Sequence, residues 1–101
     1  MAADLTPTIY HLALVADWER DEEQDYDVST IGRSRLDEGF IHCSFAEQVP
    51  ATAAAFYQDR DDVLLLEIDV ARLTSPVQID DGFPHIYGPL NRDAVVRSSR
   101  Y

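Results

Sequence analysis

The sequence has few of the residues and segments that would assign it to several large classes of protein. Its 101 residues contain one cysteine, Cys43, which excludes an internal disulfide and fits a reducing compartment. No apolar run reaches the roughly 18–20 residues that a membrane-spanning helix needs. The first residues also lack the basic and apolar regions of a signal peptide. We therefore expect a cytoplasmic protein that does not associate with membranes.

Lysine is absent as well, and positive charge is scarce. All 8 basic residues are arginines, against 19 acidic residues, which gives a formal net charge of −11 at pH 7. A chain this acidic is repelled by a nucleic-acid backbone and by an anionic membrane surface. The composition therefore argues against general nucleic-acid binding, and it leaves a small-molecule ligand or a protein partner as the open alternatives.

Length and patterning indicate a single domain over residues 1–101. Strand-forming residues fill 9–15, 40–44, 63–69 and 94–97, and a further strand or tight loop is expected over 82–90. Residues 45–57 carry the best helical pattern, with Pro50 in the first turn and a capping-box spacing between Ser44 and Glu47. The acidic segment 17–27 is expected to be a solvated face or loop. This order of elements predicts an α+β fold with a small mixed sheet and short helices.

The three histidines, His11, His42 and His85, each lie in a predicted strand or at its end. Strand side chains alternate between faces, so each strand keeps bulky apolar residues for the core when its histidine faces outward. This arrangement permits one polar cleft on the sheet with an aromatic rim. The alternative is that each histidine is a hydrogen-bonded structural residue. The same-face neighbours expected at the cleft are Phe40, Ser44, Phe83 and Tyr87.

Other site chemistries have weaker support in the sequence. No two histidines have the spacing of metal ligands, so we assign no metal site and keep a zinc-dependent hydrolase only as an alternative. Cys43 follows His42 in a strand and points to the opposite face, which favours a buried structural thiol over a nucleophile. Ser44 either caps the following helix or binds a ligand through its hydroxyl. No glycine-rich phosphate loop or dinucleotide fingerprint is present.

Two charged residues allow two interpretations each. Glu67, inside an apolar strand, is either exposed at an edge or buried, where its carboxylate would need a partner. Arg92 either binds a phosphate through its planar guanidinium or forms an internal salt bridge with one of the many acids.

Several motifs together resemble a known bacterial family. They are Ile-Tyr-His-Leu at 9–12, Glu-Gly-Phe-Ile-His-Cys-Ser at 38–44 and Phe-Pro-His-Ile-Tyr-Gly-Pro-Leu-Asn at 83–91, supported by 48–50 and 64–69. Over residues 9–96 the chain resembles the bacterial domain-of-unknown-function family 952. The resemblance implies a fold similar to the ADP-ribosyltransferase-like fold, a split β-sheet with small helices.

The resemblance also implies a ligand, NAD or a related nucleotide such as an ADP-ribose derivative. By position, His11 matches a histidine that contacts a ribose, and His42 matches the second motif position, which makes these two the expected catalytic residues of a transferase or hydrolase. The third position falls near His85 and Tyr87 and lacks a glutamate, so ADP-ribosyl transfer to protein is not implied. The alternative is a non-catalytic ligand- or protein-binding module that kept the cleft. The expected ligand-binding residues are His11, Ser44, His85, Tyr87 and Arg92.

Overall fold

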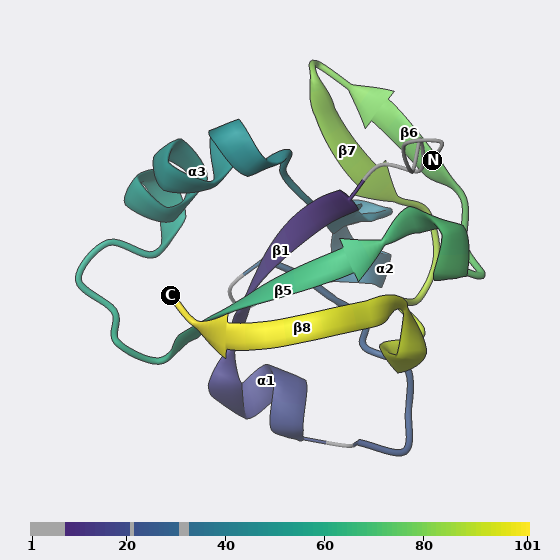
Figure 1. The fold of residues 1–101 in the computed structure, drawn as a ribbon, viewed down its shortest axis with the longest axis horizontal. Coiled ribbons are helices and arrows are strands. Elements are labelled where there is room, and N and C mark those ends of the chain that lie inside the picture. The colour runs from purple at the N-terminus through teal and green to yellow at the C-terminus, as the bar shows by residue number, and fades with distance from the viewer. Residues whose placement is uncertain (1–7, 21, 31–32) are drawn as a thin grey trace, which may run out of the picture.

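The fold is built around strand β5 (Val63–Asp69), the most continuously apolar segment of the chain. The computed structural model describes residues 8–20, 22–30 and 33–101. In it, β5 pairs antiparallel with β1 (Thr8–Leu14) on one side and with β8 (Val95–Arg100) on the other (Figure 1). Leu66 and Ile68 of β5 are completely buried. The predicted central strand is thus confirmed, and its apolar residues anchor the core.

A second three-stranded sheet holds β4 (Ile41–His42), β7 (Phe83–Ile86) and β6 (Val77–Asp80), in the order β4-β7-β6. Strands β6 and β7 form a hairpin whose turn residues, Asp81 and Gly82, have φ values of 53° and 84°. Positive φ at both positions is the geometry of a tight hairpin turn, for which Asp-Gly is a preferred sequence. In the sheet, His42 lies directly opposite His85.

The two three-stranded sheets are joined at an isolated bridge between Tyr10 and Ser44. The amide of Tyr10 donates to the carbonyl oxygen of Ser44 at 2.8 Å. The amide of Ser44 donates to the carbonyl oxygen of Tyr10 at 2.7 Å. This bridge places His11 of β1 beside the segment that carries His42. The bridge therefore helps to set the position of the first histidine relative to the second.

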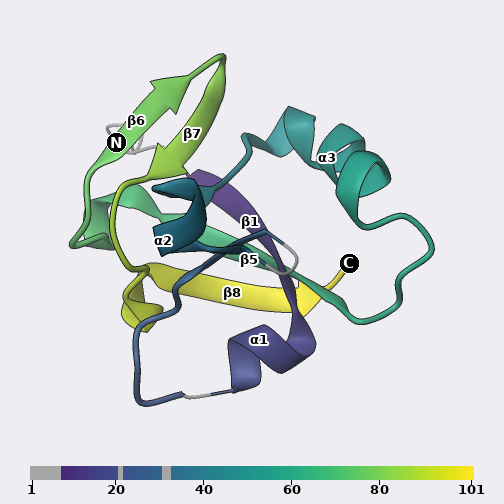
Figure 2. The ribbon, with the colours of Figure 1, turned by 180° about the vertical axis from the view of Figure 1, so that it is seen from behind.

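The remaining elements are short. Strands β2 (Val28–Thr30) and β3 (Arg33–Ser34) pair with each other and lead into helix α2 (Arg35–Glu38). In Figure 2, α2 lies in front of the sheet formed by β1, β5 and β8. Helix α1 (Val15–Glu19) follows β1. The helix expected over 45–57 is a 3₁₀ turn, Ala46–Gln48, followed by α3 (Val49–Phe56), with Pro50 in its first turn as predicted. Further 3₁₀ turns are Val70–Arg72 and Arg92–Ala94.

Two groups of buried side chains form the core. One lies between the sheets and includes Ile9, Ile41, Cys43, Leu66 and Ile86, and burial raises the pKa of the Cys43 thiol well above its ordinary value. The other consists of Val49 and Ala53 of α3 together with Leu12, Tyr57 and Val63.

The structure confirms a small α+β domain with antiparallel sheets and short helices. No helix in the described part of the chain is long and apolar enough to cross a membrane.

Candidate functional site

The pairing of β4 with β7 brings two histidines into direct contact. His42 faces His85 across the two strands, and Nδ1 of His42 lies 3.1 Å from Nε2 of His85. The alternation of strand side chains puts Tyr87 on the same face as His85, and the hairpin register adds Asp80 of β6. Four polar side chains from three strands therefore lie on one face of the small sheet.

Asp80 anchors this group at one end. Its Oδ2 accepts hydrogen bonds from Nδ1 of His85, at 2.9 Å, and from the hydroxyl of Tyr87. These hydrogen bonds lower the pKa of Asp80, the one from Tyr87 having the larger effect and the one from His85 the next largest. The carboxylate is therefore ionised at neutral pH. In the tautomer of His85 that donates from Nδ1 to Asp80 and accepts at Nε2, His42 is the donor and donates from Nδ1. This arrangement puts one proton on each Nδ1 and leaves Nε2 of His42 unprotonated.

His42 has the properties of a base that is accessible to a ligand. Its side chain is partly buried, and none of the residues in the described ranges hydrogen-bonds its Nε2. Burial lowers the pKa of His42, as does the neighbouring His85, while Glu38 acts in the opposite direction. The ring is therefore neutral at pH 7 and can accept a proton at Nε2.

His42 and His85 form part of the wall of a cleft of about 350 Å³. The ring of Phe40 stacks on His85 with 4.0 Å between centroids and 7° between planes, and the Phe83 centroid lies 5.3 Å from that of His42. Phe56, at the end of α3, is 56% exposed at the edge of the cleft. The remaining lining residues are Ser29, Glu38, Asp80 and Asp81.

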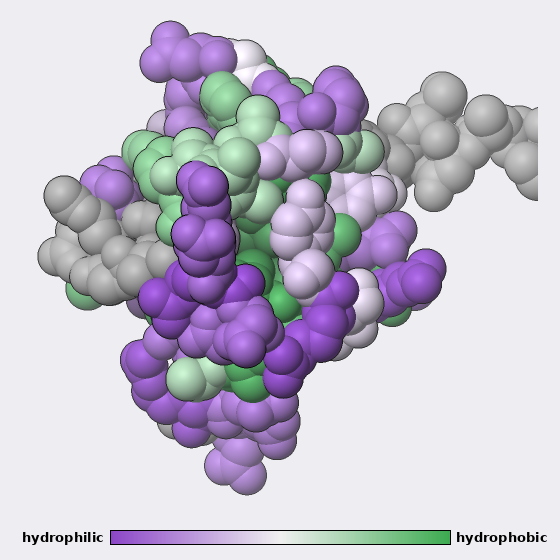
Figure 3. Space-filling model, turned by 90° about the vertical axis from the view of Figure 1, so that its left-hand side faces the viewer, coloured by the Kyte–Doolittle hydropathy of each residue, from purple (hydrophilic) through white to green (hydrophobic). Residues whose placement is uncertain are grey.

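A second hollow of about 350 Å³ adjoins this cleft and is mostly apolar. It shares His42, Phe56 and Phe83 with the cleft and continues along α3 to Ala51 and Ala55. Figure 3 shows that apolar and weakly polar residues gather over α3, whereas hydrophilic residues dominate the lower part of that face. A ligand at His42 therefore meets an acidic environment on one side and an apolar one on the other.

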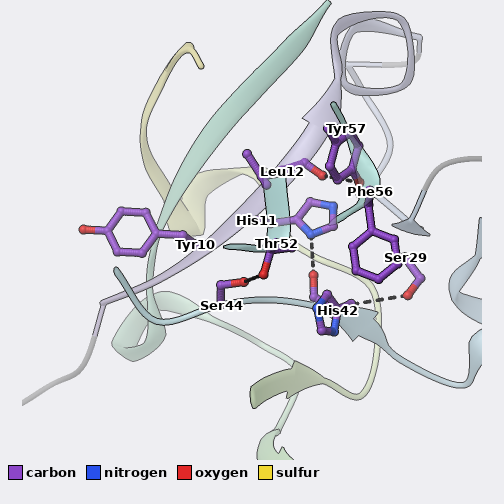
Figure 4. A pocket seen from close by; sticks show the side chains of 9 residues that line it. All are labelled: Tyr10, His11, Leu12, Ser29, His42, Ser44, Thr52, Phe56 and Tyr57. Atoms are coloured by element: carbon purple, nitrogen blue, oxygen red, sulfur yellow. Dashed lines mark hydrogen bonds between the residues drawn. The ribbon is translucent and has the colours of Figure 1, made fainter. Parts of the chain in front are cut away.

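His11 lies behind His42 and does not line the cleft; with His42 and Ser44 it lines a small neighbouring pocket of about 10 Å³, shown in Figure 4. It is 2% exposed, and its Nδ1 lies 2.6 Å from the carbonyl oxygen of His42, to which it donates. Its Nε2 lies 3.0 Å from the hydroxyl of Tyr26, which donates in return. Burial lowers the pKa of His11 to about 4. Both ring nitrogens of this histidine have partners in the protein, so its position is that of a support for the backbone of His42.

Ser44 lines the same small pocket as His11 and does not cap the following helix. It is 4% exposed, and its hydroxyl pairs with that of Thr52 at 3.1 Å, as Figure 4 shows. At the start of the helical segment, the side chain of Gln48 accepts a hydrogen bond from the Phe45 amide at 2.8 Å. The predicted capping role of Ser44 is therefore wrong, because its hydroxyl is turned towards α3 and Gln48 bonds the free amide instead. Tyr87 likewise bonds Asp80 rather than facing the cleft.

The two charged residues with open interpretations lie elsewhere. The guanidinium of Arg92 stacks 4.4 Å above the Trp18 ring and donates to the carbonyl oxygens of Trp18 and Gln24. Arg92 therefore ties the chain before β8 to the segment near α1 and does not line the histidine cleft. Glu67 is partly exposed on β5 and lies in register with Arg97 of β8.

Sequence reasoning overlooked Asp80, Glu38 and the position of Phe56 at the edge of the cleft. For Asp80 a signal was available, since Asp81-Gly82 favours a two-residue hairpin and so sets the register of β6 against β7. That register puts Asp80 on the face of His85. Across residues 8–20, 22–30 and 33–101, no three His, Cys, Asp or Glu side chains are grouped as metal ligands.

Comparisons with known proteins agree with this description of the fold. The family described as "Protein of unknown function (DUF952)" matches residues 13–98. The crystal structure of protein CC0527 from Caulobacter crescentus is similar, with 29% identity and a TM-score of 0.79 over 92% of this chain and 84% of that one. The solution NMR structure of CC0527 gives a TM-score of 0.69 at 29% identity, over 92% and 83% of the two chains. No curated protein matches the chain.

Proposed function

The chain belongs to the DUF952 family, whose function is unknown, and we propose that its cleft binds a small NAD- or ADP-ribose-type nucleotide on which His42 acts as general acid–base. The observation that carries this proposal is the hydrogen-bonded series from Asp80 through His85 to His42, which ends in an unprotonated nitrogen at an aromatic cleft. Histidine is the most common general base in enzymes, and such a base is often oriented by a hydrogen bond to a third group, as His85 here is bonded to both His42 and Asp80.

The series gives His42 a defined proton chemistry. When Nε2 of His42 takes a proton from a hydroxyl or a water, the ring becomes cationic and its Nδ1–H strengthens the hydrogen bond to His85. His85 in turn is held by the ionised Asp80, which stabilises positive charge on the pair. When His42 returns the proton to a leaving group, the neutral arrangement is restored. The site is therefore equipped for transfer or hydrolysis at the sugar of a nucleotide.

The aromatic walls provide for the ring of such a ligand. Phe40, Phe56 and Phe83 surround the histidines, and a planar base or nicotinamide can stack on or against their rings. His11 contributes by holding the carbonyl of His42, and Tyr87 by holding Asp80, so both are positioning residues in this proposal. We further propose an ADP-ribosyltransferase-like fold, supported by two separate three-stranded sheets with one histidine on β1 and another on β4.

A non-catalytic binding module is the second candidate. No glutamate stands at the third motif position, on the C-terminal strands, although Glu38 lines the cleft from another direction. In this alternative the cleft retains its ligand and the histidine pair binds it without turnover. The two candidates share a binding site and differ in whether product forms.

An NMR titration of labelled protein with NAD, ADP-ribose, AMP and nicotinamide tests both candidates. Shifts that cluster on His42, Phe83 and His85, and that disappear in His42→Ala but not in Glu19→Gln, would support binding at the cleft. Glu19 is exposed on α1, at the other end of the molecule, so its variant controls for charge. Release of nicotinamide from NAD by the wild type, but not by His42→Ala, would establish turnover. No response to any of the four ligands at millimolar concentration would exclude the proposed function.

A further inference from the structure

Among the side chains that the structure describes, the charged residues that line the cleft are all acidic. Glu38, Asp80 and Asp81 contribute carboxylates to its lining, and no arginine is present among the lining residues that the structure describes. Asp80 keeps its negative charge because its hydrogen bonds to Tyr87 and His85 favour the ionised form. The chain as a whole carries a formal charge of −11, so the field at this cleft attracts cations.

The aromatic residues of the cleft strengthen this preference. The faces of phenylalanine rings are negative, and a cation held against such a face within about 6 Å of its centre is attracted to it. Phe56 and Phe83 both lie next to His42, with ring centroids 6.4 Å and 5.3 Å from the imidazole. Phe56 is more than half exposed, so a ligand at this position covers apolar surface as well. Aromatic faces and carboxylates on one cleft together favour an organic cation.

We infer that the cleft selects a positively charged planar ring, of the N-alkylated pyridinium type, over a neutral ring of the same shape. This deepens the proposed function and rests on it, since it specifies which part of a nucleotide enters the cleft. In this proposal the ring lies between Phe56 and Phe83, near the carboxylate of Asp81, with Nε2 of His42 at its edge. The phosphates of a larger ligand extend away from the acidic lining.

The test compares two probes of nearly equal size, 1-methylnicotinamide, which is cationic, and nicotinamide, which is neutral. Cation–π attraction and partly exposed ion pairing together predict that the cation binds about tenfold more tightly at low salt. The advantage should shrink as sodium chloride is added, because exposed charges are screened. Affinities are read from the amide shifts of His42, Phe83 and Asp81.

Charge variants assign the effect to the cleft. Asp81→Asn should weaken the binding of 1-methylnicotinamide severalfold and leave nicotinamide unchanged, whereas Glu19→Gln on α1 should change neither. Because Asp81 is exposed and has φ of 53°, which asparagine adopts readily, the variant is expected to fold normally. Phe83→Leu, which keeps an apolar wall without the ring face, should reduce the preference for the cation.

The outcomes separate this inference from the proposed function. Equal affinity for the two probes, or shifts centred on Ala51 and Ala55 in the apolar hollow, would overturn the inference and leave nucleotide binding intact. Tight binding of 1-methylnicotinamide without any response to NAD or ADP-ribose would support the inference and overturn the proposed function. Absence of binding by either probe would overturn the inference, and the titration with NAD would then decide the proposed function by itself.

Discussion

Two histidines that are linked through one carbonyl group differ in almost every property that matters for function. The ring of His11 is buried, bonds Tyr26 and the backbone of His42 with its two nitrogens, and has its pKa lowered to about 4. The ring of His42 is only partly buried and donates to His85, and its Nε2 is directed to no hydrogen-bond partner within the described residues. Position in the fold, rather than residue type, thus separates the buried, fully hydrogen-bonded histidine from the one that lines the cleft.

The comparison also shows how the core supports the cleft. His11 donates a hydrogen bond to the carbonyl of His42, so a buried side chain holds the backbone that positions this proposed general base. The hydroxyl of Tyr26 fixes the tautomer of His11 in turn. Changes in the core should therefore alter stability first, and changes at the cleft should alter binding and proton transfer first.

Removal of the buried ring should produce the largest effect. His11→Ala leaves the His42 carbonyl and the Tyr26 hydroxyl without partners and opens a cavity, for which we expect a loss of about 4 kcal/mol in the free energy of unfolding. His42→Ala, at the partly exposed position, should cost about 1 kcal/mol or less. Urea unfolding of both variants measures the difference. Equal losses for the two variants would mean that the distinction between core and cleft histidines is incorrect.

Tyr26→Phe, a milder change at the hydrogen bond between Tyr26 and His11, should cost about 1 kcal/mol in the free energy of unfolding.

Acid should reveal the same distinction without mutation. The pKa of His11 is about 4 in the folded state and near 6.5 in an unfolded chain, so the unfolded state binds more protons between these values. The contribution of His11 is complete above pH 6.5 and is lost as the pH falls towards 4, by about 3 kcal/mol in total. Calorimetry across this range measures the loss. In parallel, ring resonances should show His42 protonating at higher pH than His11, and the reverse order would contradict the assignment of roles.

At the cleft, loss of the negative charge of Asp80 should make His42 a weaker base. Asp80→Asn removes the charge that stabilises a protonated histidine pair, so the pKa of His42 should fall further and any turnover should drop by about tenfold or more. The ring resonances of His42 give the direction of the pKa change. Asp61→Asn, at an exposed position after α3, serves as the control for charge. An unchanged titration of His42 in Asp80→Asn would show that the hydrogen-bonded series does not act as a unit.

The smallest effect is expected from removal of one hydroxyl. Tyr87→Phe deletes the main cause of the lowered pKa of Asp80, so that pKa should rise towards its ordinary value while His85 retains its hydrogen bond. The free energy of unfolding should change only slightly, because Asp80 and Tyr87 are both partly exposed. Carbon NMR of the Asp80 carboxyl group follows its titration directly. A lower pKa in the variant would contradict the hydrogen-bond assignment.

The sequence predicted those parts of the fold in which a pattern is long. Seven residues with strand-forming side chains identify β5, and the apolar spacing with Pro50 identifies α3, although its first turn is a 3₁₀ turn. It could not show that His42 pairs with His85, because β4 contains only two residues and its register with β7 is set by tertiary packing. Tyr26 was missed for a related reason. It is an isolated apolar residue in an acidic segment, yet it is 2% exposed.

The bridge between Tyr10 and Ser44 has a consequence for motion in this molecule. Two backbone hydrogen bonds join the sheet of β1 to the segment leading from β4, and the bond from His11 to the carbonyl of His42 lies beside them. Separation of the sheets at this place would expose the two bridge amides to solvent and displace His42, the proposed general base, in the same event. The protection factors of these two amides against hydrogen exchange should therefore be equal, and they report how often His42 leaves its position.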